Sequence, residues 1–278
     1  MLLAIDVGNT NTVMGLYRLA TSETPAVQTH RWRMGTVQRT LDELRLLISG
    51  MFSMDGVDIK SVTGIAVSSV VPPIDSLFRE VLEKLFGIKP LFVEPGVKTG
   101  LPVLTDNPAE TGADRIVNCV AAFERYGGPT IVVDLGTATT FDVISARGEF
   151  LGGAIAPGIG ISADALFSSA ARLSRVNIRK PMKVIGTGTV DNIQIGLFYG
   201  YVGLIDGICE RMVAELGPET KVIATGGFAK MLAESSRTIR QVDENLTLDG
   251  VRLIYERNQD RVRRRAQAAS QHHAQRAE

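Results

Sequence analysis

The sequence predicts an α/β protein built from two similar halves. One pattern occurs near the N-terminus and again at residues 130–144: an apolar strand, an Asp, a Gly turn with small polar residues, and a second apolar strand. Helical and strand-like periodicities alternate after each copy. The chain has 278 residues, of which 45% are hydrophobic, and this is enough for two domains with separate cores.

The first copy spans residues 2–17. Apolar residues lead to Asp6, Gly8 allows a tight turn, and a second apolar segment follows at 13–17. This pattern predicts a buried β-hairpin with a polar tip. Such a tip suits a metal-bound phosphate, because the carboxylate can hold Mg²⁺ or its waters while small residues approach the phosphate oxygens. Taken alone, D-x-G-x-T is short and common, so an ordinary turn is the better explanation of this stretch by itself.

The second copy changes that balance. Its turn repeats the first at a constant offset, with Asp6, Gly8 and Thr12 corresponding to Asp134, Gly136 and Thr140. Two such hairpins in register with a half-chain repeat are much stronger evidence than one. They predict two similar α/β halves. If these halves face each other, both aspartates and both Gly turns line one cleft, where they could hold a metal–nucleotide complex.

A helix start is predicted between the two copies. Asn107-Pro108 followed by Glu110 is a typical beginning, and the helix should end near Gly127. Asp114 and Arg115 then lie in the first turns. The helix dipole also stabilises an Asp there, so a purely structural role remains one interpretation. Arg115 is more informative, because it offers planar anion recognition beside a potential base.

The other elements follow from periodicity and turn signals. We expect strands at 29–34, 61–71, 91–93 and 221–228, a strand leading to a loop at 150–160, and helices at 40–52, 74–86, 161–173, 191–216 and after residue 245. Thr189 either caps the long helix or binds a ligand, and its spacing favours the cap. The Thr225-Gly226-Gly227 strand end leaves room for a flat ring at a ligand-binding sheet edge, or is a plain strand-to-helix turn.

Composition excludes several classes of function. Lys plus Arg and Asp plus Glu each number 30, so no net charge favours nucleic acid or an anionic membrane. Cys119 and Cys209 lie in apolar helical surroundings and are expected to be buried free thiols. The N-terminal apolar run contains Asp6, unlike a signal peptide, and no apolar stretch spans a bilayer. We expect a cytoplasmic protein with a disordered Arg-rich tail at 259–278.

Taken together, these motifs resemble the actin-like ATPase superfamily of acetate and sugar kinases, and within it the type III pantothenate kinases. The resemblance rests on five segments in the expected order, at residues 6–11, 107–115, 134–140, 152–158 and 246–258. It covers nearly the whole chain. It implies two similar ribonuclease-H-like domains with a central cleft, at residues 1–125 and 126–258, before the tail.

The resemblance also implies a reaction. The γ-phosphoryl group of ATP passes to the primary hydroxyl of pantothenate, the first step of coenzyme A biosynthesis. Asp6 then faces Mg²⁺, Asp134 binds a monovalent cation such as K⁺ or NH₄⁺, and Asp114 is the general base. The implied nucleotide contacts are Asp6, Val7, Gly8, Asn9, Thr10, Asn11, Thr12, Val13 and Thr137. The implied pantothenate contacts are Gly112, Ala113, Asp114, Arg115 and Thr189. The family is expected to be homodimeric, with the cation and pantothenate sites near the subunit interface.

The residue chemistry agrees with this implication. Phosphoryl transfer needs positioning, charge neutralisation and one group that orients the attacking hydroxyl, which a carboxylate can do. Arg115 could hold a substrate carboxylate. The chain lacks the G-x-x-x-x-G-K-[ST] phosphate-loop motif and its lysine, so a monovalent cation could offset phosphate charge.

Two alternatives stay open at this point. A non-catalytic nucleotide-binding regulator would keep both hairpins but would need neither the Asp114–Arg115 pair nor Asp134. A kinase for a sugar or another small alcohol would use the same scaffold. Some members of the family carry a Tyr near Thr105 that contacts substrate, and this chain has none, so that side of the pocket is expected to differ in detail.

Overall fold

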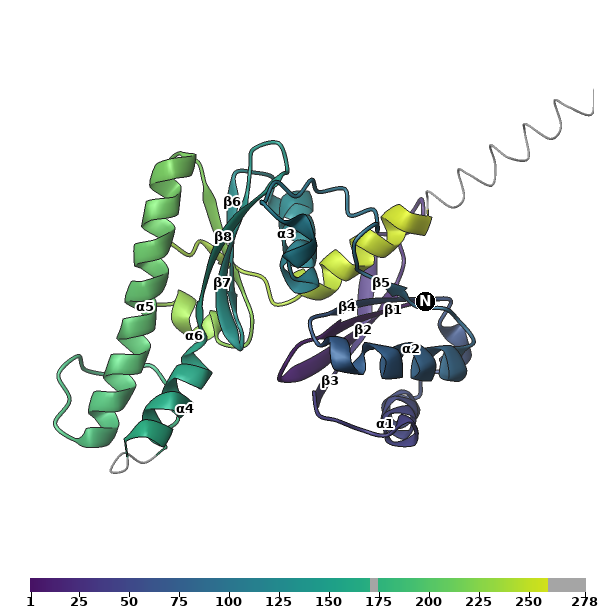
Figure 1. Ribbon diagram of the computed structural model, residues 1–278, viewed down its shortest axis with the longest axis horizontal. Coiled ribbons are helices and arrows are strands. Elements are labelled where there is room, and N and C mark those ends of the chain that lie inside the picture. The colour runs from purple at the N-terminus through teal and green to yellow at the C-terminus, as the bar shows by residue number, and fades with distance from the viewer. Residues whose placement is uncertain (171–174, 260–278) are drawn as a thin grey trace, which may run out of the picture. The chain divides into compact units, whose positions relative to one another are not determined.

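The computed structural model describes residues 1–170 and 175–259, and it divides into two compact units (Figure 1). The first contains Met1–Gly100, Ala109–Val120 and the described residues from Thr247 onward, and the second contains Leu101–Pro108 and Ala121–Leu246. The boundary therefore falls within one helix, α3 (Ala113–Tyr126). Apart from Gln259, the predicted tail at 259–278 lies outside the described residues.

The first unit is built on a five-stranded mixed sheet. Its strands are β1 (Leu2–Val7), β2 (Asn11–Arg18), β3 (Val27–Gly35), β4 (Gly64–Ser69) and β5 (Leu91–Phe92), in the order β3-β2-β1-β4-β5. The first three form antiparallel pairs, and β4 and β5 extend the sheet in parallel with β1. The predicted first hairpin and the strands near residues 29–34, 61–71 and 91–93 are thus confirmed.

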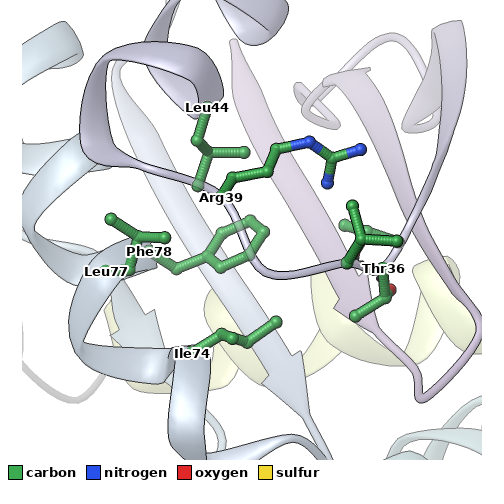
Figure 2. Close-up of a pocket in the computed structure, with 8 residues that line it drawn as sticks. Thr36, Arg39, Leu44, Ile74, Leu77 and Phe78 are labelled. Carbon is green, nitrogen blue, oxygen red and sulfur yellow. Dashed lines mark hydrogen bonds between the residues drawn. The ribbon is translucent and has the colours of Figure 1, made fainter.

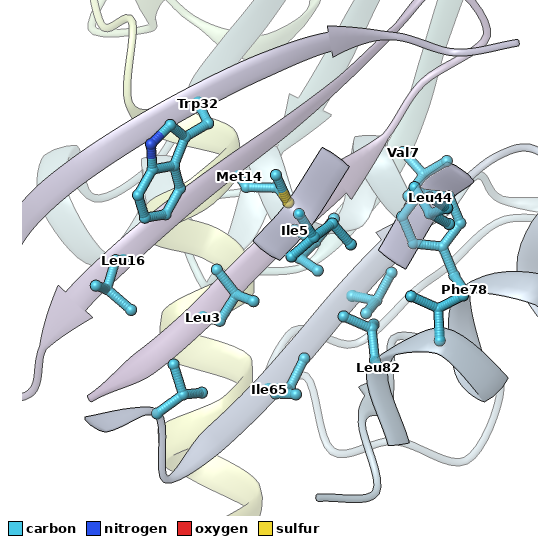
Figure 3. Close-up of a cluster of buried hydrophobic side chains, with 14 of the residues drawn as sticks. Leu3, Ile5, Val7, Met14, Leu16, Trp32, Leu44, Ile65, Phe78 and Leu82 are labelled. Carbon is cyan, nitrogen blue, oxygen red and sulfur yellow. The ribbon is translucent and has the colours of Figure 1, made fainter. Parts of the chain in front are cut away.

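Strand alternation divides this sheet between two covering layers. Leu3, Ile5 and Val7 join the apolar core with α1 (Leu41–Met54) and α2 (Pro72–Phe86), as Figure 3 shows. The intervening side chains, including that of Asp6, face the opposite side. A capping box between Thr40 and Glu43 fixes the start of α1. A short 3₁₀ turn, η1 (Ile59–Ser61), leads into β4.

The opposite face is covered by a helix at residues 246–259. Leu248 lies against Gly15, and the Tyr255 hydroxyl lies where a Cβ at Gly64 would stand. This packing explains why the helix belongs to the first unit, whereas the predicted division at residues 125 and 126 placed it in the second half. Two strand glycines leave the space into which this helix packs, and periodicity alone does not reveal its partner.

The second unit repeats the sheet. It contains β6 (Thr130–Leu135), β7 (Ala138–Ile144), β8 (Phe150–Pro157), β9 (Lys221–Thr225) and β10 (Gln241–Val242), in the order β10-β9-β6-β7-β8. Read from β8, this is the same arrangement as β3-β2-β1-β4-β5. Its core packs one sheet face against α4 (Ile159–Ser169), α5 (Thr189–Leu216) and α6 (Ala229–Ala233).

The internal repeat is confirmed, with one correction in the turn. Residues 8–10 join β1 to β2, whereas Gly136 and Thr137 alone join β6 to β7. Asp6 consequently pairs with Val13, and Asp134 pairs with Thr140. Thr12 therefore corresponds to Thr139, not to Thr140, and both Thr12 and Thr139 are buried. A constant sequence offset cannot reveal a one-residue difference in a turn.

Two predicted helix starts are also corrected. Pro108–Glu110 forms only a 3₁₀ turn, η2, and α3 begins at Ala113, where the Gly112 carbonyl accepts the N–H of Ile116 at 3.3 Å. The long helix α5 begins at Thr189 after Gly188, so Thr189 is not its cap. Residues 171–173 of the predicted helix 161–173 lie outside the described residues.

Two expectations from composition can be compared with the structure. Cys119 and Cys209 are both buried free thiols, as predicted. Among the described residues, no helix combines the length and apolar character needed to cross a bilayer.

Candidate active site

The first candidate element is the turn between β1 and β2. Asp6 is half-buried near the end of β1, and the side chains of Asn9, Thr10 and Asn11 are exposed at the tip. The Gly8 N–H donates to the Asn11 carbonyl at 3.1 Å, and a Cβ on Gly8 would lie 3.1 Å from the same oxygen. The turn therefore presents small polar groups and backbone to solvent, as an oxyanion-binding tip requires.

Thr36 supports this turn from behind. Its N–H donates to the Thr10 carbonyl at 2.9 Å, and its hydroxyl lies 2.9 Å from that of Thr12. The two threonines open onto a shallow depression on the α1 and α2 side of the sheet (Figure 2), lined by Thr12, Thr36, Val37, Arg39, Leu44, Ile74, Leu77 and Phe78. Most of that lining is apolar, so the depression suits support of the turn better than phosphate binding.

A buried hydroxyl without a partner lies beside Asp6. Ser68 on β4 is the direct neighbour of Asp6 in the sheet, and in-register neighbours project to the same face. Ser68 is fully buried, and its Oγ has no hydrogen-bond partner among the described residues. Native structures rarely leave a buried hydroxyl unpaired without a reason. A metal-binding carboxylate at Asp6 would provide that partner.

These residues fit a magnesium–nucleotide complex. The described residues contain no cluster of three or more His, Cys, Asp or Glu side chains that could enclose a metal. Mg²⁺ does not need such an enclosure, because proteins usually hold it through one or two carboxylates, waters and the phosphates of the substrate. At such a site Asp6 would supply the carboxylate, and Ser68 would supply a hydroxyl that can orient it.

The second candidate element is the start of α3. Asp114 is the second residue of this helix, and its Oδ1 accepts the N–H of Arg115 at 2.8 Å. Burial raises the pKa of the Asp114 carboxyl above its ordinary value, an effect that the Arg115 N–H and guanidinium only partly offset. A raised pKa makes a carboxylate a better proton acceptor while it remains ionised near neutral pH.

The structure brings Asp114 and the first turn into the same unit. Gly112 lies so close to Asp114 that a Cβ there would stand 2.6 Å from Oδ1, and 3.6 Å from the Val70 side chain. The Val70 N–H in turn donates to the Val7 carbonyl at 3.1 Å, one residue beyond Asp6. The predicted phosphate turn and the predicted substrate segment therefore both lie beside Val70, which directly follows β4.

The third candidate element is the turn between β6 and β7 in the second unit. Asp134 is half-buried, Thr137 is exposed at the tip, and Thr225 on β9 is the sheet neighbour of Asp134. Gly226 has φ +96°, and a Cβ there would stand 2.6 Å from the Asp134 Oδ1. The Thr225-Gly226-Gly227 segment therefore lies directly against the aspartate, which sequence analysis did not anticipate.

The remaining candidates lie in the second unit. Thr189 is exposed at the start of α5, and its approach to the Gly112–Arg115 segment stays a prediction. The Thr105 Oγ1 is buried without a hydrogen-bond partner among the described residues. Sequence analysis missed Ser68. The Ser68-Ser69 pair before Pro72-Pro73 was visible, but the pairing of β4 with β1 had to be known before its meaning emerged.

The chain matches known proteins over most of its length. The family model of type III pantothenate kinase matches residues 2–211. The chain is 57% identical to the type III pantothenate kinase of Koribacter versatilis over 270 residues, covering 95% of this chain and 98% of that one. It is 55% identical to that of Acidobacterium capsulatum over 257 residues, covering 92% and 94%.

Solved structures show the same fold. A Campylobacter jejuni structure described as a Baf family transcriptional activator has a TM-score of 0.57 at 20% identity, covering 93% of this chain and 99% of that one. The ethanolamine utilization protein EutJ from Carboxydothermus hydrogenoformans has a TM-score of 0.52 at 11% identity, covering 91% and 89%. The predicted α/β class with two similar halves is thereby confirmed. On the strength of the family model and these close relatives, the chain belongs to the type III pantothenate kinase family.

Proposed function

We propose that this protein transfers the γ-phosphoryl group of ATP to the primary hydroxyl of pantothenate, forming 4′-phosphopantothenate and opening coenzyme A biosynthesis. Family membership supports the activity. The structural observation that carries it is the link from Gly112 through Val70 to Val7, because it holds the candidate base and the candidate phosphate turn in one unit. Effective phosphoryl transfer depends mainly on such positioning.

The first turn is proposed to bind MgATP. As a kinase, the protein uses ATP with a divalent metal. Asp6 and Ser68 would hold the metal end, and the metal supplies charge neutralisation between the phosphates when bound. The exposed tip from Gly8 to Asn11 would approach the phosphate oxygens, and Val7, Thr12 and Val13 would shape its flanks.

Asp114 is proposed to accept the proton of the pantothenate hydroxyl. The hydroxyl oxygen forms a bond to the γ-phosphorus, the bond from that phosphorus to the β,γ-bridging oxygen breaks, and ADP leaves. The proton passes to the Asp114 carboxylate. Arg115 would bind the pantothenate carboxylate as a planar, always charged donor, while Gly112 and Ala113 keep the backbone close to the substrate.

The second unit is proposed to hold a monovalent cation, K⁺ or NH₄⁺, at Asp134. The support is a half-buried carboxylate beside Thr225 and Gly226. Thr137 at the exposed tip would touch ATP, and Thr189 would touch pantothenate.

A homodimer is also proposed. Apolar side chains are exposed on the edge strand β8, on the segment before α5 and in the first turn of α5: Leu151, Ile155, Met182, Val184, Ile185 and Val190. An edge strand with exposed apolar side chains is typical of an interface. Light scattering after gel filtration should give a dimer mass for the wild type and a monomer mass for Ile155→Glu. The predicted cytoplasmic location stays a prediction.

One assay distinguishes the alternatives. Purified protein is supplied with MgATP, KCl and either pantothenate or one of a panel of sugars and small alcohols, and ADP release is coupled to NADH oxidation. We expect ADP release with pantothenate alone, and mass spectrometry of the product should show one added phosphate. Release with a sugar instead would identify another kinase. Nucleotide binding without turnover on any acceptor would favour the non-catalytic regulator.

A further inference from the structure

A row of four side chains crosses the end of the first sheet on one face. In-register pairing places Arg33 of β3 beside Val13, Val13 beside Asp6, and Asp6 beside Ser68. Cross-strand partners project to the same side of a sheet. The alternation along β3 agrees, because Trp32 and Met34 enter the core with α1 and α2 while Arg33 is exposed. Arg33 therefore projects from the same face as Asp6.

Arg33 is within reach of a ligand bound at Asp6. Neighbouring strands lie about 4.8 Å apart, so two spacings separate the Arg33 and Asp6 backbones by about 10 Å. A long arginine side chain can extend over the small Val13 between them. Within the described residues, the Arg33 side chain forms no hydrogen bond or ion pair. Its guanidinium therefore does not have to leave another partner to bind an anion.

Binding of a triphosphate at this row requires positive charge. A triphosphate carries more negative charge than one Mg²⁺ neutralises, and this chain has no phosphate-loop lysine. Arg252, another cation of this unit, is already engaged with Glu256 at 2.8 Å and with Asp249. An exposed guanidinium offers several donors in a planar fork that matches phosphate oxygens.

The second sheet shows that the fold itself does not require a cation there. The position equivalent to Arg33 is Ile155 of β8, which pairs with Thr140 beside Asp134. Ile155 is 65% exposed, so an apolar residue is tolerated at the same edge. Packing and register therefore leave the identity of this residue open, and the charge at Arg33 points to a ligand.

We propose that Arg33 binds the phosphates of the nucleotide on the Asp6 face. It supplies the positive charge that the turn between β1 and β2, which has no phosphate-loop lysine, does not provide. This inference rests on the proposed function for the identity of the ligand. It assigns Arg33 to nucleotide binding and not to pantothenate binding.

The test uses Arg33→Gln, Arg33→Lys and the matched control Arg31→Gln. Arg31 lies two residues before Arg33 on β3 and projects from the same face. It pairs with Gly15 and is therefore further from Asp6 than Arg33 is. Calorimetry measures binding of the non-hydrolysable analogue AMP-PNP with Mg²⁺ at low and high salt, and steady-state kinetics give the KM for ATP and for pantothenate separately. Thermal melting checks that each full-length variant is folded.

We expect Arg33→Gln to weaken AMP-PNP binding and raise the KM for ATP by about tenfold to a hundredfold, the usual range for a charge-assisted contact. The KM for pantothenate should stay unchanged, and the salt dependence of AMP-PNP binding should become shallower. Arg33→Lys should recover part of the loss, because it keeps the charge without the fork. Arg31→Gln should bind AMP-PNP as the wild type does.

Two results would overturn the inference: unchanged AMP-PNP affinity in Arg33→Gln, or an equal loss in Arg31→Gln. These outcomes are separable from failure of the proposed function. A wild type that phosphorylates pantothenate while Arg33→Gln binds nucleotide normally contradicts only the role of Arg33. A wild type that binds AMP-PNP through Arg33 but phosphorylates no pantothenate contradicts only the reaction.

Discussion

The two sheets carry the same backbone but different side chains at the row that contains each hairpin aspartate. In the first sheet the row is Arg33, Val13, Asp6 and Ser68. In the second it is Ile155, Thr140, Asp134 and Thr225. The central carboxylate and a neighbouring hydroxyl are kept, while the outer position changes from an exposed cation to an exposed apolar residue. Of these two rows, only the first contains a positively charged side chain, which the proposed binding of a polyphosphate would use.

The residues behind the two turns differ in the same way. Thr36 and Gly158 each follow the edge strand and donate an N–H to the turn carbonyl, at 2.9 Å to Thr10 and 3.0 Å to Thr137. Thr36 adds a hydroxyl contact to Thr12. At Gly158 a Cβ would stand 2.2 Å from the Thr137 carbonyl oxygen, so no side chain fits. The second turn is shorter, and the Gly158 backbone packs closely against it. Gly158 has no side chain to support the turn as the Thr36 hydroxyl supports the first one.

The largest expected effect is on kcat and follows from changing Asp114, in the unit that holds the first turn. Asp114→Asn should lower kcat by about a hundredfold to ten thousandfold, because the general base is lost while the shape is kept. The KM values for ATP and pantothenate should change far less. Single-turnover phosphorylation measured by quenched flow gives the chemical step directly. Near-normal kcat in this variant would remove Asp114 as the base.

The hydroxyls of Ser68 and Thr225, each beside one of the two aspartates, give a sharper test of the comparison between the sheets. Ser68→Ala should raise the Mg²⁺ concentration for half-maximal activity by about tenfold to a hundredfold, the usual cost of losing a group that orients a metal ligand. Thr225→Val should raise the K⁺ requirement instead. Mg²⁺-dependent thermal shifts in the presence of ADP provide a second readout that does not depend on turnover.

Ser69→Ala is the matched control for Ser68→Ala. Ser69 is the next residue of β4, faces α2, and donates to Asp75 at 2.5 Å. Its loss should lower the melting temperature without altering the Mg²⁺ requirement. If Ser68→Ala and Ser69→Ala shifted the Mg²⁺ requirement equally, the assignment of Ser68 to the metal side would be wrong.

The tighter second turn predicts a stability effect. Gly158→Ala should destabilise the protein by about 1–3 kcal/mol, because the added methyl meets backbone oxygens of Thr137 and Gly136. Gly160→Ala, two residues along, places its methyl 3.9 Å from Phe228 and should be neutral or slightly stabilising. Urea denaturation of both variants decides between them, and equal stability would contradict the close approach seen at Gly158.

The smallest expected effect is a pH-dependent gain in thermal stability in the Asp114→Asn variant. Burial raises the pKa of the Asp114 carboxyl, so above that pKa the folded wild type holds a penalised ionised carboxylate that the variant lacks. The variant should melt about 1–4 °C higher near pH 8. The difference should vanish below about pH 4, where the carboxyl is protonated in both folded and unfolded chains. Calorimetric scans across this range check it, and a lower melting temperature at pH 8 would contradict the burial.

Much of this fold could be predicted from residues alone, because strand alternation and the repeated hairpin are local patterns. The failures have physical causes. Pro108–Glu110 forms only a 3₁₀ turn, and the first hydrogen bond of α3 is accepted by Gly112, several residues after the start that the local capping pattern predicts. Gly15 and Gly64 leave space for the final helix on the first sheet, a packing partner that no local pattern in the sequence identifies. The site shows the same limit. Asp6 and Asp114 carry recognisable motifs, whereas Ser68 and Arg33 gain meaning only from strands that pair across long stretches of sequence.

The division of labour between the two aspartates can be measured most directly by titrating Mg²⁺ and K⁺ independently for Asp6→Asn and Asp134→Asn, with pantothenate phosphorylation and AMP-PNP affinity as readouts. Asp6→Asn should need far more Mg²⁺, by at least about a hundredfold, and keep its K⁺ dependence. Asp134→Asn should lose its response to K⁺ and keep the Mg²⁺ dependence of the wild type. If both variants shifted the same cation, the two sheets would share one role and the account would be contradicted.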